Sequence, residues 1–306
     1  MRLLTRSDFD GLVSAVLLVE KGIVDKYKFV HPKDVQDGEV EVTDEDVLAN
    51  IPFVKGCGLW FDHHASESER LEISKLDFEG DCRHAPSAAQ VIWDYYGGEK
   101  TFGKHLLPLM DAVNKSDSGN LTSEEITNPK AWILLSFIMD PRTGLGRFRD
   151  YRISNYQLME DMIQYCRTMT ADEILEIPDV AERKKRYFEQ QELFKEMLNR
   201  CCEVKKNVIV INLMNEDVIY SGNRFLVYAL YPEQNIEVRV MWGRNRQNVV
   251  FSCGHSILNR TCQTDVGKLM LKYAGGGHER VGTCQVSVND WKQTLDSIVD
   301  QMTKEG

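Results

Sequence analysis

The chain has 306 residues, of which 42% are hydrophobic and 27% charged, and its formal net charge at pH 7 is −10. This composition is that of a globular protein, and the length predicts two domains. No run of 18 apolar residues occurs, and Asp8 and Asp10 interrupt the N-terminal stretch, so we expect no export, no membrane insertion and a cytoplasmic location.

The acidic excess lies in the first two thirds of the chain. From Glu203 onward there are 12 Lys and Arg against 11 Asp and Glu, and before it there are 25 against 36. Proteins that bind long duplexes normally carry a basic stripe, because the release of counterions drives that binding. A long duplex nucleic acid is therefore not expected as a partner, whereas a short phosphorylated substrate is compatible with this charge. The eight cysteines contain no C-x-x-C pair and are expected to be reduced thiols.

Short apolar runs alternate with helical patterns over the first 120 residues. "RLLT", "KYKFVHP" and "GLWFDHH" read as strands, and "GLVSAVLLVEKG" and "APSAAQVIWDYYG" read as helices. This alternation predicts βαβ units and an α/β domain with a mainly parallel sheet, whose functional residues usually follow the carboxyl ends of strands.

The charged stretch "DVAERKKRYFEQQELFKEMLNRCC" predicts a long connecting helix. After it, "NVIVINL", "RFLVYALY", "IEVRVMWG" and "NVVFSCG" read as strands, and "DVGKLMLKYA" reads as a helix. We therefore predict a first domain over residues 1–165, a helical connector over 166–203 and a smaller α+β domain over 204–306.

Asp8 and Asp10 stand one residue apart between the first predicted strand and helix. One of the two carboxylates serves as a helix N-cap, but capping does not explain the presence of the second. In "TDED", ahead of "VLANI", Asp46 is explained equally well by a capping box that begins at Thr43. Asp111 and Asp117 place negative charge near the C-terminal end of a later predicted helix, where the helix dipole disfavours it. Carboxylates without a compensating charge there indicate a nearby cation.

Asp62, His63 and His64 follow an apolar strand and offer carboxylate and imidazole ligands of the kind that bind Mn²⁺. Consecutive residues at a strand end point in opposite directions, so the two histidines cannot play the same role. We expect one to bind the metal and the other to face a phosphate.

A glycine cluster lies near the C-terminus, formed by Gly275, Gly276, Gly277 and His278. Successive glycines allow close approach of the backbone to a ligand and turn N–H groups toward an anion. An ordinary glycine-rich turn is the alternative interpretation.

Taken in order, "SDFDG", "DHH", a later acidic residue and "GGGH" resemble the DHH phosphoesterase superfamily with its DHH-associated C-terminal domain. That superfamily includes RecJ-like exonucleases, nanoRNases, cyclic-dinucleotide phosphodiesterases and family II pyrophosphatases. The resemblance spans Asp8 to Gly282 and is strongest to the nanoRNase, cyclic-nucleotide phosphodiesterase and exopolyphosphatase-like branch.

The resemblance implies two Mn²⁺ ions per site, with Mg²⁺ or Co²⁺ as alternatives. Asp8 would bind the first ion, and the second would be held by Asp10, His63 and Asp117. Asp46, or alternatively Asp44, would bridge the two ions, and Asp111 is the alternative to Asp117.

The remaining roles that the resemblance implies concern the substrate. His64 would contact the scissile phosphate, and Asp62 would orient its neighbours. The glycine cluster with His278 would bind the terminal phosphate or nucleotide, with Arg260 as a further anion contact.

One departure from the family pattern stands upstream of Asp8. Many members have a histidine two to four residues before this aspartate, where the present chain has Leu4, Thr5 and Arg6. Either the first metal is held more weakly or through water, or Arg6 substitutes a fixed charge and binds the substrate. Arg142 lies in a later loop that reads as a phosphate track or as a solvated segment.

We therefore expect a Mn²⁺-dependent phosphodiesterase that hydrolyses short oligonucleotides or cyclic (di)nucleotides through metal-activated water. An exopolyphosphatase or 3′-phosphonucleotide phosphatase is the alternative enzyme, distinguished by whether a nucleobase is required. A nucleotide-binding regulatory module without turnover is the alternative from another class. The expected partner is a dinucleotide, short RNA or cyclic nucleotide, and a homodimer is left open.

Overall fold

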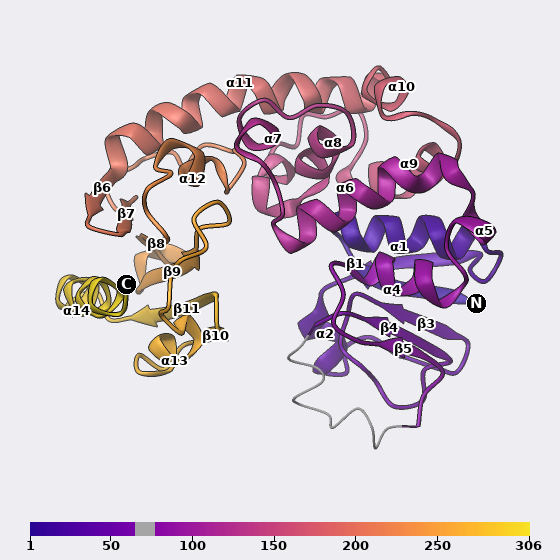
Figure 1. The fold of residues 1–306 in the computed structure, drawn as a ribbon, viewed down its shortest axis with the longest axis horizontal. Coiled ribbons are helices and arrows are strands. Elements are labelled where there is room, and N and C mark those ends of the chain that lie inside the picture. Colours follow the sequence, from indigo (N-terminus) through magenta and orange to yellow (C-terminus); the bar gives the residue numbers. More distant parts are fainter. Residues whose placement is uncertain (65–76) are drawn as a thin grey trace. The chain divides into compact units, whose positions relative to one another are not determined.

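The computed structural model describes residues 1–64 and 77–306 (Figure 1). Contacts divide the chain into two units, residues 1–120 with 129–187 and residues 121–128 with 188–306. The long helix α11 (Pro178–Cys201) begins in the first unit and ends in the second. The finer division at residues 165 and 203 stays a prediction.

In the described part of the first unit, five parallel strands form one sheet in the order β2-β1-β3-β4-β5. These strands are β1 (Arg2–Arg6), β2 (Lys26–Val30), β3 (Asp46–Ala49), β4 (Leu59–Asp62) and β5 (Gly80–Cys82). Strands β3 and β4 are buried along their whole length, as expected where helices cover both faces of a parallel sheet. The predicted α/β domain with a parallel sheet is confirmed.

Helices cover both faces of this sheet. Leu4, Leu48 and Trp60 form a core on one face with Val35 of α2 (Pro32–Gln36). The helices α1, α4, α6 and α9 pack together, and α1 and α4 also contact the strands. The other helices of the unit are α1 (Phe9–Glu20), α4 (Ala88–Tyr95), α5 (Glu99–Phe102), α6 (Leu107–Ser118), α8 (Ala131–Met139), α9 (Asn155–Thr168) and α10 (Ala171–Leu175), with short 3-10 turns at Lys104–Leu106, Pro141–Thr143 and Leu145–Arg147.

The second unit contains a mixed sheet. Within residues 188–306, all of which the structure describes, six strands lie in the order β10-β11-β9-β8-β7-β6, and only β7 and β8 pair in parallel. They are β6 (Cys202–Lys205), β7 (Val208–Asn212), β8 (Ile236–Trp242), β9 (Val249–His255), β10 (Gly276–His278) and β11 (Val281–Val286).

The helices of the second unit include one that was predicted as a strand. The run "RFLVYALY" forms α12 (Leu226–Leu230), because a short apolar run without alternation fits a buried helix as well as a strand. The remaining helices are α7 (Ser123–Thr127), α13 (Val266–Leu271) and α14 (Trp291–Glu305), with a 3-10 turn at Arg244–Arg246. Helix α14 packs on the sheet through a stripe formed by Leu295, Ile298, Val299 and Met302.

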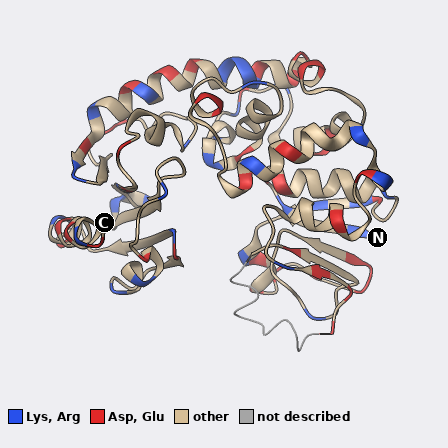
Figure 2. Ribbon diagram, viewed as in Figure 1, with Lys and Arg blue, Asp and Glu red and all other residues tan. Residues whose placement is uncertain are grey.

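Acidic and basic residues alternate along α11, as Figure 2 shows. In the described ranges, no helix combines the length and apolar character needed to cross a membrane. All eight cysteines lie in these ranges as free thiols.

Candidate metal centre

The register of the sheet brings three strand ends together. Thr5 of β1 pairs with Ala49 of β3, and Ala49 pairs with Phe61 of β4. Residues just beyond these pairs, Asn50 and Asp62 among them, therefore share the carboxyl edge of the sheet. This is the edge at which α/β proteins bind ligands.

Asp8 and Asp10 enter this edge from the turn between β1 and α1. Asp8 is the N-cap of α1, and its Oδ1 accepts a hydrogen bond of 3.0 Å from the Gly11 N–H. Asp10 lies in the first turn, and its two oxygens accept bonds of 2.9 Å from the N–H groups of Ala88 and Ala89. The positive end of α4 thus holds the Asp10 carboxylate in one orientation.

Asp10, His63 and Asp117 form a compact group whose ligand atoms all lie within 4.8 Å of one another. His63 Nε2 is 3.6 Å from Asp10 Oδ2 and 3.2 Å from Asp117 Oδ2. His63 follows β4, and Asp117 lies in the last turn of α6. Three residues from separate segments of the chain therefore bring their metal-ligand atoms close together.

The protonation state of His63 leaves a lone pair without a partner among these ligand atoms. Its Nδ1 lies 3.1 Å from the Ala85 carbonyl oxygen, which only accepts, so Nδ1 carries the proton. The buried Nε2 is then a lone pair directed at two carboxylates, and it has no hydrogen-bond partner among the described residues. Burial lowers the pKa of His63, which keeps the imidazole neutral.

A divalent cation would satisfy Asp10, His63 and Asp117 together. Burial raises the pKa of Asp10 well above its usual value, and the neighbouring charges of Asp117 and Asp8 raise it further. A cation reverses that effect, because it favours the charged carboxylates and accepts the histidine lone pair. Two carboxylates and one neutral imidazole thus form a divalent metal site, and the role of each individual ligand stays a prediction.

His64 differs from its neighbour in charge. Its Nδ1 donates a hydrogen bond of 2.7 Å to Asp62 Oδ1, which also accepts the His63 N–H at 2.8 Å. Burial opposes the charged form, but the bond to Asp62 outweighs it and raises the pKa of His64 to about 9. His64 is therefore an imidazolium near neutral pH, while His63 is neutral.

Asp8 has surroundings unlike those of Asp10. Its Oδ1 accepts 3.0 Å hydrogen bonds from Gly11 and from Asn50 Nδ2, and its Oδ2 pairs with Arg6 Nε at 3.1 Å. Asn50 is a functional candidate that the sequence reasoning missed. The signal is its position, directly after the last residue of β3 and with a left-handed backbone (φ 56°).

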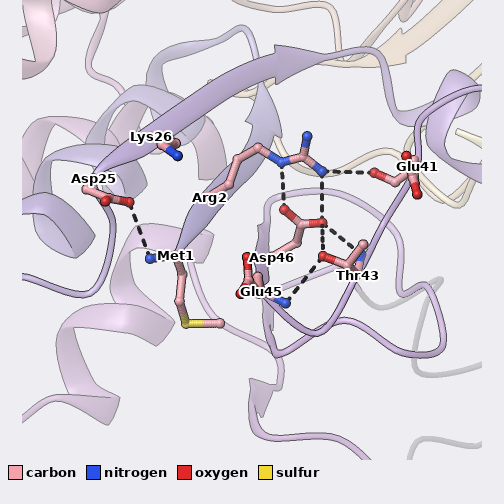
Figure 3. Close-up of a pocket in the computed structure, with 8 residues that line it drawn as sticks. All are labelled: Met1, Arg2, Asp25, Lys26, Glu41, Thr43, Glu45 and Asp46. Atoms are coloured by element: carbon pink, nitrogen blue, oxygen red, sulfur yellow. Dashed lines mark hydrogen bonds and ion pairs between the residues drawn. The ribbon is translucent and has the colours of Figure 1, made fainter.

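Asp46 lies elsewhere, which corrects its prediction as the bridging ligand. It is the first residue of β3, and Arg2 at the start of β1 pairs with it in the sheet, so it lies at the amino edge. Its carboxylate accepts from Arg2 Nε at 2.6 Å and Nη2 at 2.9 Å, and from the Thr43 N–H at 2.8 Å (Figure 3). The box that joins Thr43 and Asp46 precedes a strand rather than a helix.

Asp46 is expected to contribute to stability. Burial opposes the charged form, but Arg2 and Thr43 outweigh it and lower the pKa of Asp46. Asp46→Asn should reduce the free energy of unfolding by about 2 kcal/mol, the typical contribution of charged hydrogen bonds. The loss should shrink as the pH falls below about 4, because protonation then removes the wild-type ion pair as well. Denaturant unfolding at pH 7 and pH 3 measures this, and unchanged stability or lost Mn²⁺ binding in Asp46→Asn would contradict it.

The two alternative aspartates are also outside the group. Asp44 is exposed and precedes β3, at the amino edge of the sheet. Asp111 lies on α6 with 65% of its side chain exposed, and it pairs with Lys115 at 2.9 Å. The structure brings neither of them to Asp10 and His63.

The glycine cluster lies in the second unit, where two of its members are needed for packing. A Cβ at Gly275 would lie 2.2 Å from the Thr283 oxygen, and one at Gly277 would lie 2.3 Å from the Val281 oxygen. A Cβ at Gly276 would meet no atom within 4 Å. His278 and Arg260 are exposed, and their role with this cluster in binding substrate stays a prediction.

Comparison with known proteins decides the family. No family model and no curated protein matches the sequence. Among solved structures, the pGpG-specific phosphodiesterase PggH from Vibrio cholerae is 45% identical, with a TM-score of 0.88 and coverage of 100% of this chain and 99% of that one. The chain belongs to the DHH phosphoesterase superfamily.

A second DHH protein shares the fold at lower identity. RecJ in complex with Mn²⁺ from Thermus thermophilus is 13% identical, with a TM-score of 0.52. The match covers 99% of this chain and 52% of RecJ. The DHH motif of the present chain, Asp62 to His64, lies at the metal centre described above.

Proposed function

We propose that this DHH protein is a metal-dependent phosphodiesterase that hydrolyses the linear dinucleotide pGpG to two molecules of GMP. The observation that carries this proposal is the 45% identity to the pGpG-specific phosphodiesterase over the full length of both chains. The metal centre adds chemical support, because a divalent cation held by two carboxylates and an imidazole suits phosphodiester hydrolysis.

We assign the metal as Mn²⁺, held by Asp10, His63 and Asp117, with Mg²⁺ or Co²⁺ as substitutes. When bound there, such a cation lowers the pKa of a water molecule and neutralises charge on the phosphoryl group. His64 contributes a positively charged hydrogen-bond donor for a phosphate oxygen. Asp62 positions His64 through the 2.7 Å bond and keeps it protonated.

The charge of the chain favours a short substrate. The net charge of −10 and the acidic excess before residue 203 are unfavourable for binding many phosphates of a long polymer. A dinucleotide offers few phosphates, each of which a local cation can neutralise. We assign the glycine cluster, with His278 and Arg260, to recognition of the nucleotide or the terminal phosphate.

A product analysis tests this function. The protein is incubated with Mn²⁺ and, separately, with pGpG, pApA, cyclic di-GMP, inorganic polyphosphate and 3′-phosphoadenosine 5′-phosphate. We expect pGpG to be converted to GMP at the highest kcat/KM. Release of phosphate from polyphosphate or from the 3′-phosphonucleotide, without cleavage of pGpG, would favour the alternative phosphatases. Binding of pGpG without turnover would favour the regulatory module.

A further inference from the structure

The two aspartates of the opening motif stand in different electrostatic environments. Asp10 receives hydrogen bonds from two neutral backbone amides and faces Asp117 and the lone pair of His63. Asp8 instead faces a guanidinium, since Arg6 Nε is 3.1 Å from its Oδ2. The positive charge that Asp10 lacks is thus already present at Asp8.

Asn50 reinforces this difference. It occupies the carboxyl end of β3 and donates its Nδ2 hydrogen to Asp8 Oδ1, which also accepts from Gly11. An amide in this place carries no charge, whereas a residue that bridges two divalent cations needs to be negative. The carboxylate expected to bridge, Asp46, lies at the opposite edge of the sheet and pairs with Arg2.

A second guanidinium acts on the same carboxylates. Arg142 donates to Asp140 at 2.8 Å and 3.1 Å. Burial opposes its charge, but Asp140 outweighs this, and the nearby Asp8 and Asp117 raise the pKa of Arg142 further. Asp8 therefore interacts with two fixed positive charges, and both repel a cation placed beside it.

A count of charges leads to the same result. Asp8, Asp10 and Asp117 carry three negative charges, which one divalent cation and the Arg6 guanidinium neutralise. Asp62 lies outside this count, because its Oδ1 pairs with His64 Nδ1 at 2.7 Å. A second divalent cation would leave the centre with excess positive charge, and Asp8 would have to release Arg6 to bind it.

We propose that this centre holds a single divalent cation at Asp10, His63 and Asp117, and that Arg6 replaces the second cation of the DHH site. Asp8 holds Arg6, and Asn50 in turn donates a hydrogen bond to Asp8. Arg6 is a substrate-binding group in this arrangement. Its Nε holds Asp8, and 36% of its side chain is exposed. A guanidinium has further N–H donors in a planar fork that matches phosphate oxygens. This inference concerns the number of cations and goes beyond the identity of the substrate.

The test measures Mn²⁺ stoichiometry, with Mn²⁺ alone as the probe. Native mass spectrometry or equilibrium dialysis counts the ions per chain, and electron paramagnetic resonance distinguishes isolated Mn²⁺ from a spin-coupled pair. We expect one ion with an isolated signal in the wild type. The double variant Arg6→His, Asn50→Asp supplies a histidine and a carboxylate beside Asp8, and it should bind two ions with a coupled signal.

The matched control is Lys28→His, Asn120→Asp, which introduces the same two residue types at exposed positions of the same unit and should still bind one ion. Wild-type protein that binds two ions, or none, overturns the inference. A double variant that melts like the wild type but binds one ion overturns the role of Arg6 and Asn50. If that variant does not fold, Asn50→Asp alone and the wild-type count decide. Cleavage of pGpG is scored separately, so its failure leaves the stoichiometry readable.

Discussion

Replacing His63 with alanine is expected to reduce pGpG hydrolysis by about 10³-fold or more, the range seen when a principal electrostatic contribution is removed. His63 Nε2 is the neutral metal-ligand atom that faces Asp10 and Asp117, and no other imidazole in the described ranges does so. Without it, the buried carboxylate of Asp10 and the half-buried carboxylate of Asp117 remain to hold the cation. Steady-state kinetics with saturating Mn²⁺ measures the loss, and a Mn²⁺ titration should show weaker binding.

Two pairs of variants control for general damage. His105→Ala removes an exposed histidine of the same unit and should leave kcat/KM unchanged. On helix α6, Asp117→Asn should lose activity, whereas Asp111→Asn should retain it, because only Asp117 faces His63. Circular dichroism and thermal melting check that each variant is folded. Wild-type turnover in folded His63→Ala or Asp117→Asn would contradict the proposed ligands.

Replacing His64 with glutamine is expected to lower kcat by about 10²- to 10³-fold. Glutamine still offers a hydrogen-bond donor, but it lacks the positive charge that Asp62 maintains on His64. Because this charge stabilises the phosphoryl group rather than the cation, Mn²⁺ affinity should change little. A large loss of Mn²⁺ binding in His64→Gln would show instead that His64 is a metal ligand.

The pH profile gives an independent measurement of the same residue. The bond to Asp62 raises the pKa of His64 to about 9, so the cationic form predominates at pH 7 and is lost as the pH rises through that value. A bound divalent cation lowers this pKa, since like charges repel, so the alkaline limb of kcat/KM should lie at or below pH 9. This limb should be absent from His64→Gln. Wild-type activity that still rises at about pH 10, beyond that limb, would contradict the assignment.

The parts of the centre that could be predicted are those carried by short continuous motifs. Asp8 and Asp10 could be placed because a strand, a turn and the beginning of a helix follow one another within a few residues. The "DHH" motif directly follows an apolar strand. Asp46 was wrongly placed, because the four-residue strand β3 begins with the polar Asp46 and is followed directly by the polar Asn50. A shift of four residues moves the expected ligand from the carboxyl edge, where Asn50 lies, to the amino edge.

Tertiary contacts explain the remaining differences. Nothing local in "TRSDFD" indicates that Asp10 would accept hydrogen bonds from Ala88 and Ala89. The error in "RFLVYALY" has a local cause, since a short apolar run bounded by turn residues does not distinguish a helix from a strand. Periodicity was sufficient for α11, which is long.

The distance along the chain between Asp10 and α4 has a consequence for folding. The bonds from Ala88 and Ala89 to Asp10 join residues 78 and 79 positions apart, and the other two donors come from His63 and Asp117. Contacts between residues so far apart in the sequence form only after the chain has brought them together. The cation therefore cannot nucleate this domain as zinc nucleates a zinc finger, and instead it binds a nearly completed native structure.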